Sequence, residues 1–149
     1  MTRLHTFFHG KDNYLGTFYP TGHLVAMFPD LSIAQEVAKD LQFSGLIQPD
    51  EVVAVPGIEV ILHDQEHTRG PLGFLMTSLS RFIGTEAFWA ERDLYYARQG
   101  CSLLAVHCPF EEVKKAVWEH IERRKPLAAR HYSIGLGGIE HLAGDPEEG

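Results

Sequence analysis

The sequence predicts an α+β domain, a ferredoxin-like sandwich of two β-α-β units with a helical insertion between the second and third strands. The main observation is a repeat: the apolar stretch that starts at His23 and the one that starts at Ser102 are each followed by a helical pattern. Within each pattern apolar residues recur every four positions, at Ile33, Val37 and Leu41 and again at Val113, Val117 and Ile121.

Two such units most simply share one sheet, and right-handed crossovers then favour the strand order 4-1-3-2 with the helices of the units on one face. The alternative is a three-layer α/β domain in which the repeat reflects only the general likeness of β-α-β units. A single domain is expected over residues 1–149. Its parts are an arm with a possible short hairpin (1–22), the first unit (23–56), the insertion (57–100), the second unit (101–142) and an acidic tail (143–149).

Composition excludes several classes of partner. The chain has 13 basic and 20 acidic residues, and a net charge of −7 opposes non-specific attraction to nucleic acid or to anionic membranes. No stretch approaches the ~20 apolar residues of a membrane span, and the N-terminus lacks an apolar signal segment. Cys101 and Cys108 would lie ~23 Å apart on one strand, too far for a disulfide. We therefore expect a cytoplasmic protein with reduced thiols.

An irregular arm over residues 1–13, where neither a helical nor a strand period is sustained, precedes the first unit. Leu24 to Phe28 is apolar at every position, which is typical of a strand covered on both faces. Asp30 or Ser32 is then expected to cap a helix that stops at Gly45. The β-branched run 52–55, bounded by Pro56 and Gly57, predicts the second strand.

The insertion is predicted to be helical. Residues 58–67 suit either a strand or a helix, and we favour the helix. A second helix is expected from Pro71 to Gly84, and a third from its cap at Thr85 to Gly100.

The second unit contains a strand over 102–107 and a helix after Pro109 that ends at Pro126. On the outer side of this helix, Glu111 and Lys115 have the i, i+4 spacing of an ion pair. A fourth strand is expected from Ala128 to Ile134.

The segment Ala26-Met27-Phe28-Pro29-Asp30, with Ala34, Val37, Leu41 and Gly45 after it, resembles the domain of bacterial general stress proteins of the heat-induced YflT type. The resemblance covers about residues 23 to 60. It implies a link to stress responses, and it supplies no catalytic residues.

The five residues from His63 to His67 fit the H-x-x-E-H pattern, in which two histidines one helical turn apart bind zinc and the glutamate is the general base. A zinc-dependent hydrolase would use His63 and His67 as ligands and Glu66 as base, with Glu140 or another downstream carboxylate completing the metal shell. This is the alternative hypothesis, because so short a string also arises by chance in a chain with nine histidines. The preferred interpretation of the stretch is a solvated helix end.

Antiparallel pairing of the first and third strands would bring His23 close to His107 and Cys108. The three side chains are candidates for a ligand cluster, although partly exposed histidines and a small apolar cysteine are the commoner outcome. His131 and Tyr132 are expected to pack within the sheet.

Trp89, Tyr95 and Tyr96 concentrate aromatic area in the insertion. They indicate either core against the sheet, or a ligand pocket or dimer surface, because tyrosine joins an apolar ring to a polar tip. The preferred hypothesis is a non-enzymatic domain that binds a small molecule or forms a homodimer, with no cofactor. His23 and His107 join the aromatic residues as candidate ligand-binding residues.

Overall fold

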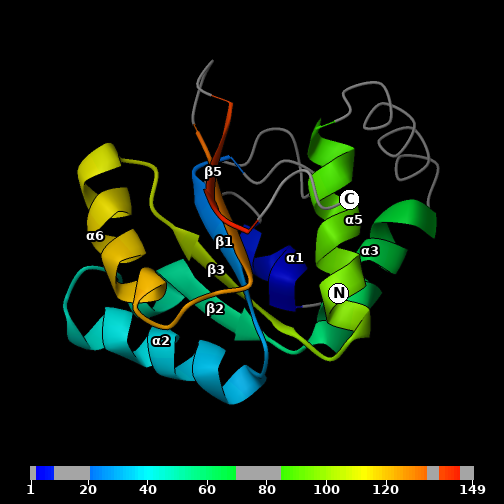
Figure 1. Ribbon diagram of the computed structural model, residues 1–149, viewed down its shortest axis with the longest axis horizontal. Helices are drawn as coiled ribbons and strands as arrows, with labels where there is room; N and C mark the ends of the chain where they lie inside the picture. Colours follow the sequence, from blue (N-terminus) through cyan, green and yellow to red (C-terminus); the bar gives the residue numbers. More distant parts are fainter. Residues whose placement is uncertain (1–2, 9–20, 70–84, 134–137, 145–149) are drawn as a thin grey trace.

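The computed structural model of the chain describes residues 3–8, 21–69, 85–133 and 138–144. It contains a five-stranded antiparallel sheet with helices on both faces (Figure 1). The strands are β1 (His23–Phe28), β2 (Val52–Val55), β3 (Ser102–His107), β4 (Ala128–Tyr132) and β5 (Ile139–Ala143). The helices are α1 (Arg3–Phe8), α2 (Leu31–Phe43), α3 (Gly57–Arg69), α5 (Thr85–Arg98) and α6 (Glu111–Glu122), with a short 3₁₀ turn η1 (Pro49–Glu51).

The sheet confirms the mixed α+β class. Its order is β2-β3-β1-β4-β5, in which β1 is paired on both sides, with β3 and with β4. Four neighbouring strands, β2-β3-β1-β4, have the predicted order 4-1-3-2 when they are read from the opposite edge. However, β5 continues the sheet beyond β4, and a second layer of helices covers the other face. The ferredoxin-like sandwich is therefore not confirmed as the complete architecture.

The first face of the sheet carries α2 and α6, the helices of the two β-α-β units. Asp30 begins α2 as its N-cap, since its carboxylate accepts a hydrogen bond of 3.1 Å from the backbone N–H of Ile33. Gly45 follows the helix with a φ of +79°, where glycine is favoured. The predicted apolar stripes of both helices face the sheet, and Leu41, Val117 and Ile121 are fully buried.

The second face carries α1, α3 and α5. The helix α1 corrects the expected irregular arm: Leu4, Phe7 and Phe8 form one apolar helical face, and they are 1%, 7% and 5% exposed. A helix of six residues is too short to show a sustained period in the sequence, and tertiary packing stabilises it. An ion pair of 2.7 Å between Arg3 Nη2 and Glu59 Oε1 joins it to α3.

Cover on both faces explains the central strand, in which all six residues of β1 are buried. Leu24 and Phe28 pack with α2 and α6, whereas Val25 and Met27 pack on the other side. Residues 57–69 form a helix, which confirms the favoured choice of a helix over a strand for residues 58–67. The fourth strand ends at Tyr132, inside the predicted range. The possible hairpin before Gly22, the helix expected from Pro71 to Gly84 and most of the acidic tail lie outside the described residues.

Candidate functional site

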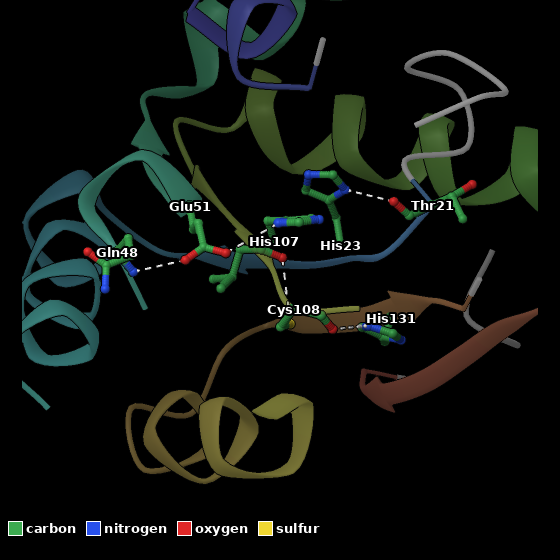
Figure 2. Close-up of polar contacts among 8 residues, drawn as sticks. Thr21, His23, Gln48, Glu51, His107, Cys108 and His131 are labelled. Atoms are coloured by element: carbon green, nitrogen blue, oxygen red, sulfur yellow. Dashed lines mark hydrogen bonds and ion pairs between the residues drawn. The ribbon is translucent and has the colours of Figure 1, made fainter. Parts of the chain in front are cut away.

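His23 and His107 lie together where β1 begins and β3 ends. They are directly paired in the antiparallel register of the two strands, and their ring centroids are 5.0 Å apart. Figure 2 shows both rings on the α1 and α3 side of the sheet. The predicted sheet pairing thus brings these two candidate residues together. Ligand binding by them stays a prediction.

His23 is the inner member of the pair and is 0% exposed. Its Nδ1 lies 3.0 Å from the carbonyl oxygen of Thr21, so Nδ1 must carry the hydrogen, because a carbonyl only accepts. The edges of Phe7 and Phe8 pack against the ring, with centroids 5.5 Å and 5.0 Å away. Phe7 and Phe8 of α1 therefore form part of the cover that keeps solvent away from this imidazole.

His107 is the more accessible member. Its Nδ1 lies 3.4 Å from Glu51 Oε2, and the two side chains are 16% and 31% exposed. Glu51 is held in turn by η1, because its Oε1 accepts a hydrogen bond of 3.2 Å from the backbone N–H of Gln48 (Figure 2). The carboxylate orients the imidazole ring of His107.

Cys108 does not join the two histidines, and the expected convergence of three ligands is wrong. Successive side chains of an extended segment point to opposite faces, so Cys108 packs on the α2 and α6 side. Its thiol donates to the carbonyl oxygen of Val106 at 3.6 Å. Burial raises the pKa of Cys108 to about 12, and burial also raises the pKa of Cys101. Both cysteines are free thiols, and they stay protonated at neutral pH.

His131 and Tyr132 are both buried within the sheet, on opposite faces, in line with the expected sheet packing. His131 Nε2 donates to the carbonyl oxygen of Cys108 at 2.9 Å, whereas its Nδ1 is buried and has no hydrogen-bond partner among the described residues. Burial lowers the pKa of His131, and the nearby Lys114 lowers it further. The hydrogen bond to Cys108 and the carboxylates Glu140 and Glu111 act in the opposite direction.

The lowered pKa of His131 predicts a loss of stability in acid. The pKa of His131 is lower in the folded state than the ordinary histidine value of about 6.5, so its contribution to stability is complete above that pH and is lost as the pH falls. His131→Gln keeps a side-chain N–H donor but cannot be protonated. We expect its unfolding free energy, measured in urea, to decline less steeply than that of the wild type between pH 7 and about pH 5. If the unfolding free energies of the wild type and of His131→Gln fell equally with pH, protonation of His131 would not be the cause of the loss.

The H-x-x-E-H stretch lies in α3, which makes residues 63 and 67 neighbours along one helix. His63 is 9% exposed, and its ring faces Phe8 with centroids 6.2 Å apart. The side chains of Glu66 and His67 lie outside the described part. Glu140 cannot complete the expected metal shell, because it accepts from Lys114 of α6 on the other side of the sheet. Among the described residues no three metal-ligating side chains cluster.

Tyr95 and Tyr96 occupy different surroundings on α5. Tyr95 is 54% exposed, whereas Tyr96 is partly buried and its hydroxyl accepts a hydrogen bond of 3.2 Å from Arg92 Nη2. Ile58 and Leu62 of α3 are 60% and 45% exposed. We call these three exposed side chains, Ile58, Leu62 and Tyr95, the outer apolar patch; they belong to α3 and α5, two helices that lie side by side (Figure 1). The side chain of Trp89 lies outside the described residues.

One buried ion pair, which joins α5 to β4, has no signal in the sequence. Arg130 Nη1 donates to Asp93 Oδ1 at 3.0 Å and Nη2 donates to Oδ2, a bidentate arrangement. Arg130 Nε also donates to the hydroxyl of Tyr132 at 2.6 Å. Arg130 and Asp93 are 2% and 9% exposed. This pair holds α5, and with it Tyr95, on the sheet.

No helix within the described ranges is long and apolar enough to cross a membrane. No family model, curated protein or solved structure matches the chain.

Proposed function

We propose that the chain is a small, non-enzymatic cytoplasmic α+β domain that acts by self-association through the outer apolar patch. The stress-related role implied by the resemblance is part of this proposal. For the fold, we propose a ferredoxin-like core, β1 to β4 with α2 and α6, to which β5 and the second helix layer are added.

The observation that carries the proposal is the exposure of Ile58, Leu62 and Tyr95, which are 60%, 45% and 54% exposed. Large apolar side chains gathered on adjacent elements are typical of protein contacts, and isolated ones are not. Tyrosine is also enriched in interfaces, since its ring is apolar and its hydroxyl can remain hydrated.

Self-association has more support than the binding of a small molecule. A ligand would need access to His23, and that ring is 0% exposed beneath Phe7 and Phe8. The outer apolar patch needs no rearrangement. Its two helices are held in place, α5 by the buried pair of Asp93 with Arg130 and α3 by its close approach to the end of α5 at Gly57. A rigid surface loses little conformational entropy on binding.

The proposal predicts that Tyr95→Ser weakens self-association about tenfold or more, because a symmetric dimer loses two copies of the side chain. The association constant is measured by sedimentation equilibrium. Phe43→Ser is the matched control: Phe43 is 91% exposed but lies at the end of α2, on the other face of the sheet. Equal effects of the two substitutions, or a wild-type chain that stays monomeric at the highest concentration measured, would overturn the proposal.

A further inference from the structure

The outward side of α5 carries an ordered row of three side chains, Glu91, Tyr95 and Arg98. The spacings of four and three residues place them on one helical face. All three are exposed, whereas Asp93 and Ala97, on the opposite side of the helix, are buried.

Glu91 and Arg98 have opposite charges that do not pair with any side chain among the described residues. Seven residues separate them along the helix, about 10 Å at the usual rise, which is too far for an ion pair. Neither of them forms an ion pair with another side chain in the described part of the chain. Each is available to a second molecule.

The order acid, tyrosine, base is self-complementary when two copies of the helix run antiparallel. A two-fold axis close to Tyr95 places Glu91 of each copy opposite Arg98 of the other, because Tyr95 lies near the midpoint between them. Such an isologous contact forms each ion pair twice. The tyrosine rings then meet at the centre, and the neighbouring helix α3 carries two more exposed apolar side chains, Ile58 and Leu62.

We propose that α5 pairs antiparallel with α5 of a second copy of this chain, with Glu91 of each copy bound to Arg98 of the other. This inference rests on the proposed function and specifies its geometry. The second copy is the best-matched occupant, since a face with one acid and one base on either side of an aromatic residue, four and three positions from it, nearly matches itself when turned end over end. Local attraction of this kind is also needed, because each chain carries a net charge of −7.

The test is a charge exchange. Glu91→Arg places like charges opposite each other twice and is expected to weaken dimerisation about tenfold or more. Arg98→Glu is expected to do the same. The double variant Glu91→Arg with Arg98→Glu restores both pairs, with their signs exchanged, and should recover most of the affinity. Glu119→Arg is the control, because it changes the net charge equally at an exposed position of α6.

Sedimentation equilibrium measures each association constant, and circular dichroism confirms that every variant is folded. Recovery in the double variant supports the antiparallel pairing. A wild-type dimer that Tyr95→Ser weakens, but whose double charge variant stays as weak as the single ones, would overturn the pairing and leave the proposed function in place. A monomeric wild type would overturn both. A weakening by Glu119→Arg equal to that by Glu91→Arg would assign the effect to net charge and overturn the pairing.

Discussion

Replacing Asp93 with alanine is expected to lower the free energy of unfolding by about 3–5 kcal/mol. Arg130 is 2% exposed, so its guanidinium would be left buried without the carboxylate that binds two of its nitrogens. Burial by itself lowers the pKa of Arg130, and the charge of Asp93, together with the hydrogen bonds to Asp93 and to the Tyr132 hydroxyl, more than reverses that effect. In the variant Asp93 no longer raises this pKa, but an arginine guanidinium stays protonated even when it is buried. The variant therefore bears the cost of an unpaired buried ion.

Urea unfolding at one low protein concentration measures this loss, since self-association would otherwise add to the apparent stability. Glu119→Ala removes an exposed carboxylate from α6 and should change the unfolding free energy by no more than about 0.5 kcal/mol. The double variant Asp93→Leu with Arg130→Met removes both charges, and it should be much less destabilising than Asp93→Ala alone. A loss as small as that of Glu119→Ala would show that the pair contributes little.

The elements that the sequence predicts best combine a long apolar period with a capping residue or a glycine. The helix that Asp30 begins and that precedes Gly45 has all of these signals, and it forms as expected. The strand at Leu24 is also predicted, because cover on both faces leaves an unbroken apolar run. α1 and β5 were missed. Six residues are too few to show a helical period, and Glu140 and His141 of β5 are exposed, which weakens the apolar pattern of a strand.

Long-range partners of charged residues were the least predictable feature. The i, i+4 spacing suggested that Glu111 pairs with Lys115, but Lys114 binds both Glu111 and Glu140, and it is 3% exposed. Spacing along a helix does not reveal that a neighbouring strand offers a second carboxylate. The pair of Asp93 with Arg130 escaped prediction for the same reason, since 37 residues separate its members.

The candidate site was predictable to the extent that strand pairing determines it. The antiparallel register places His23 opposite His107, and this follows from the expected neighbours in the sheet. Side chains alternate between the two faces of a sheet along each strand. Cys108 follows His107 directly, so it lies on the opposite face and cannot join the two histidines. The burial of His23 depends on α1, which the sequence did not indicate. The sequence therefore predicts the pairing of the two histidines in the sheet, but not the packing of α1 over His23.

Gly57→Ala is expected to destabilise the fold by about 1–3 kcal/mol, although alanine normally favours a helix more than glycine does. A Cβ atom on Gly57 would lie 2.5 Å from the carbonyl oxygen of Ala97 and 2.6 Å from that of Cys101. Both are backbone atoms, so no side-chain rotation relieves the contact, and the start of α3 must move away from the end of α5. Urea unfolding measures directly whether the substitution lowers or raises the free energy of unfolding.

The direction of the effect separates crowding from helix propensity. Without the close contact, alanine at the first position of α3 would leave the stability unchanged or raise it, by up to about 1 kcal/mol. A more stable Gly57→Ala variant would therefore contradict the tight packing of α3 on α5. The same substitution also tests the interface, because displacement of α3 shifts Ile58 and Leu62 relative to Tyr95. If the outer apolar patch mediates self-association, Gly57→Ala should weaken it even under conditions where the variant is fully folded.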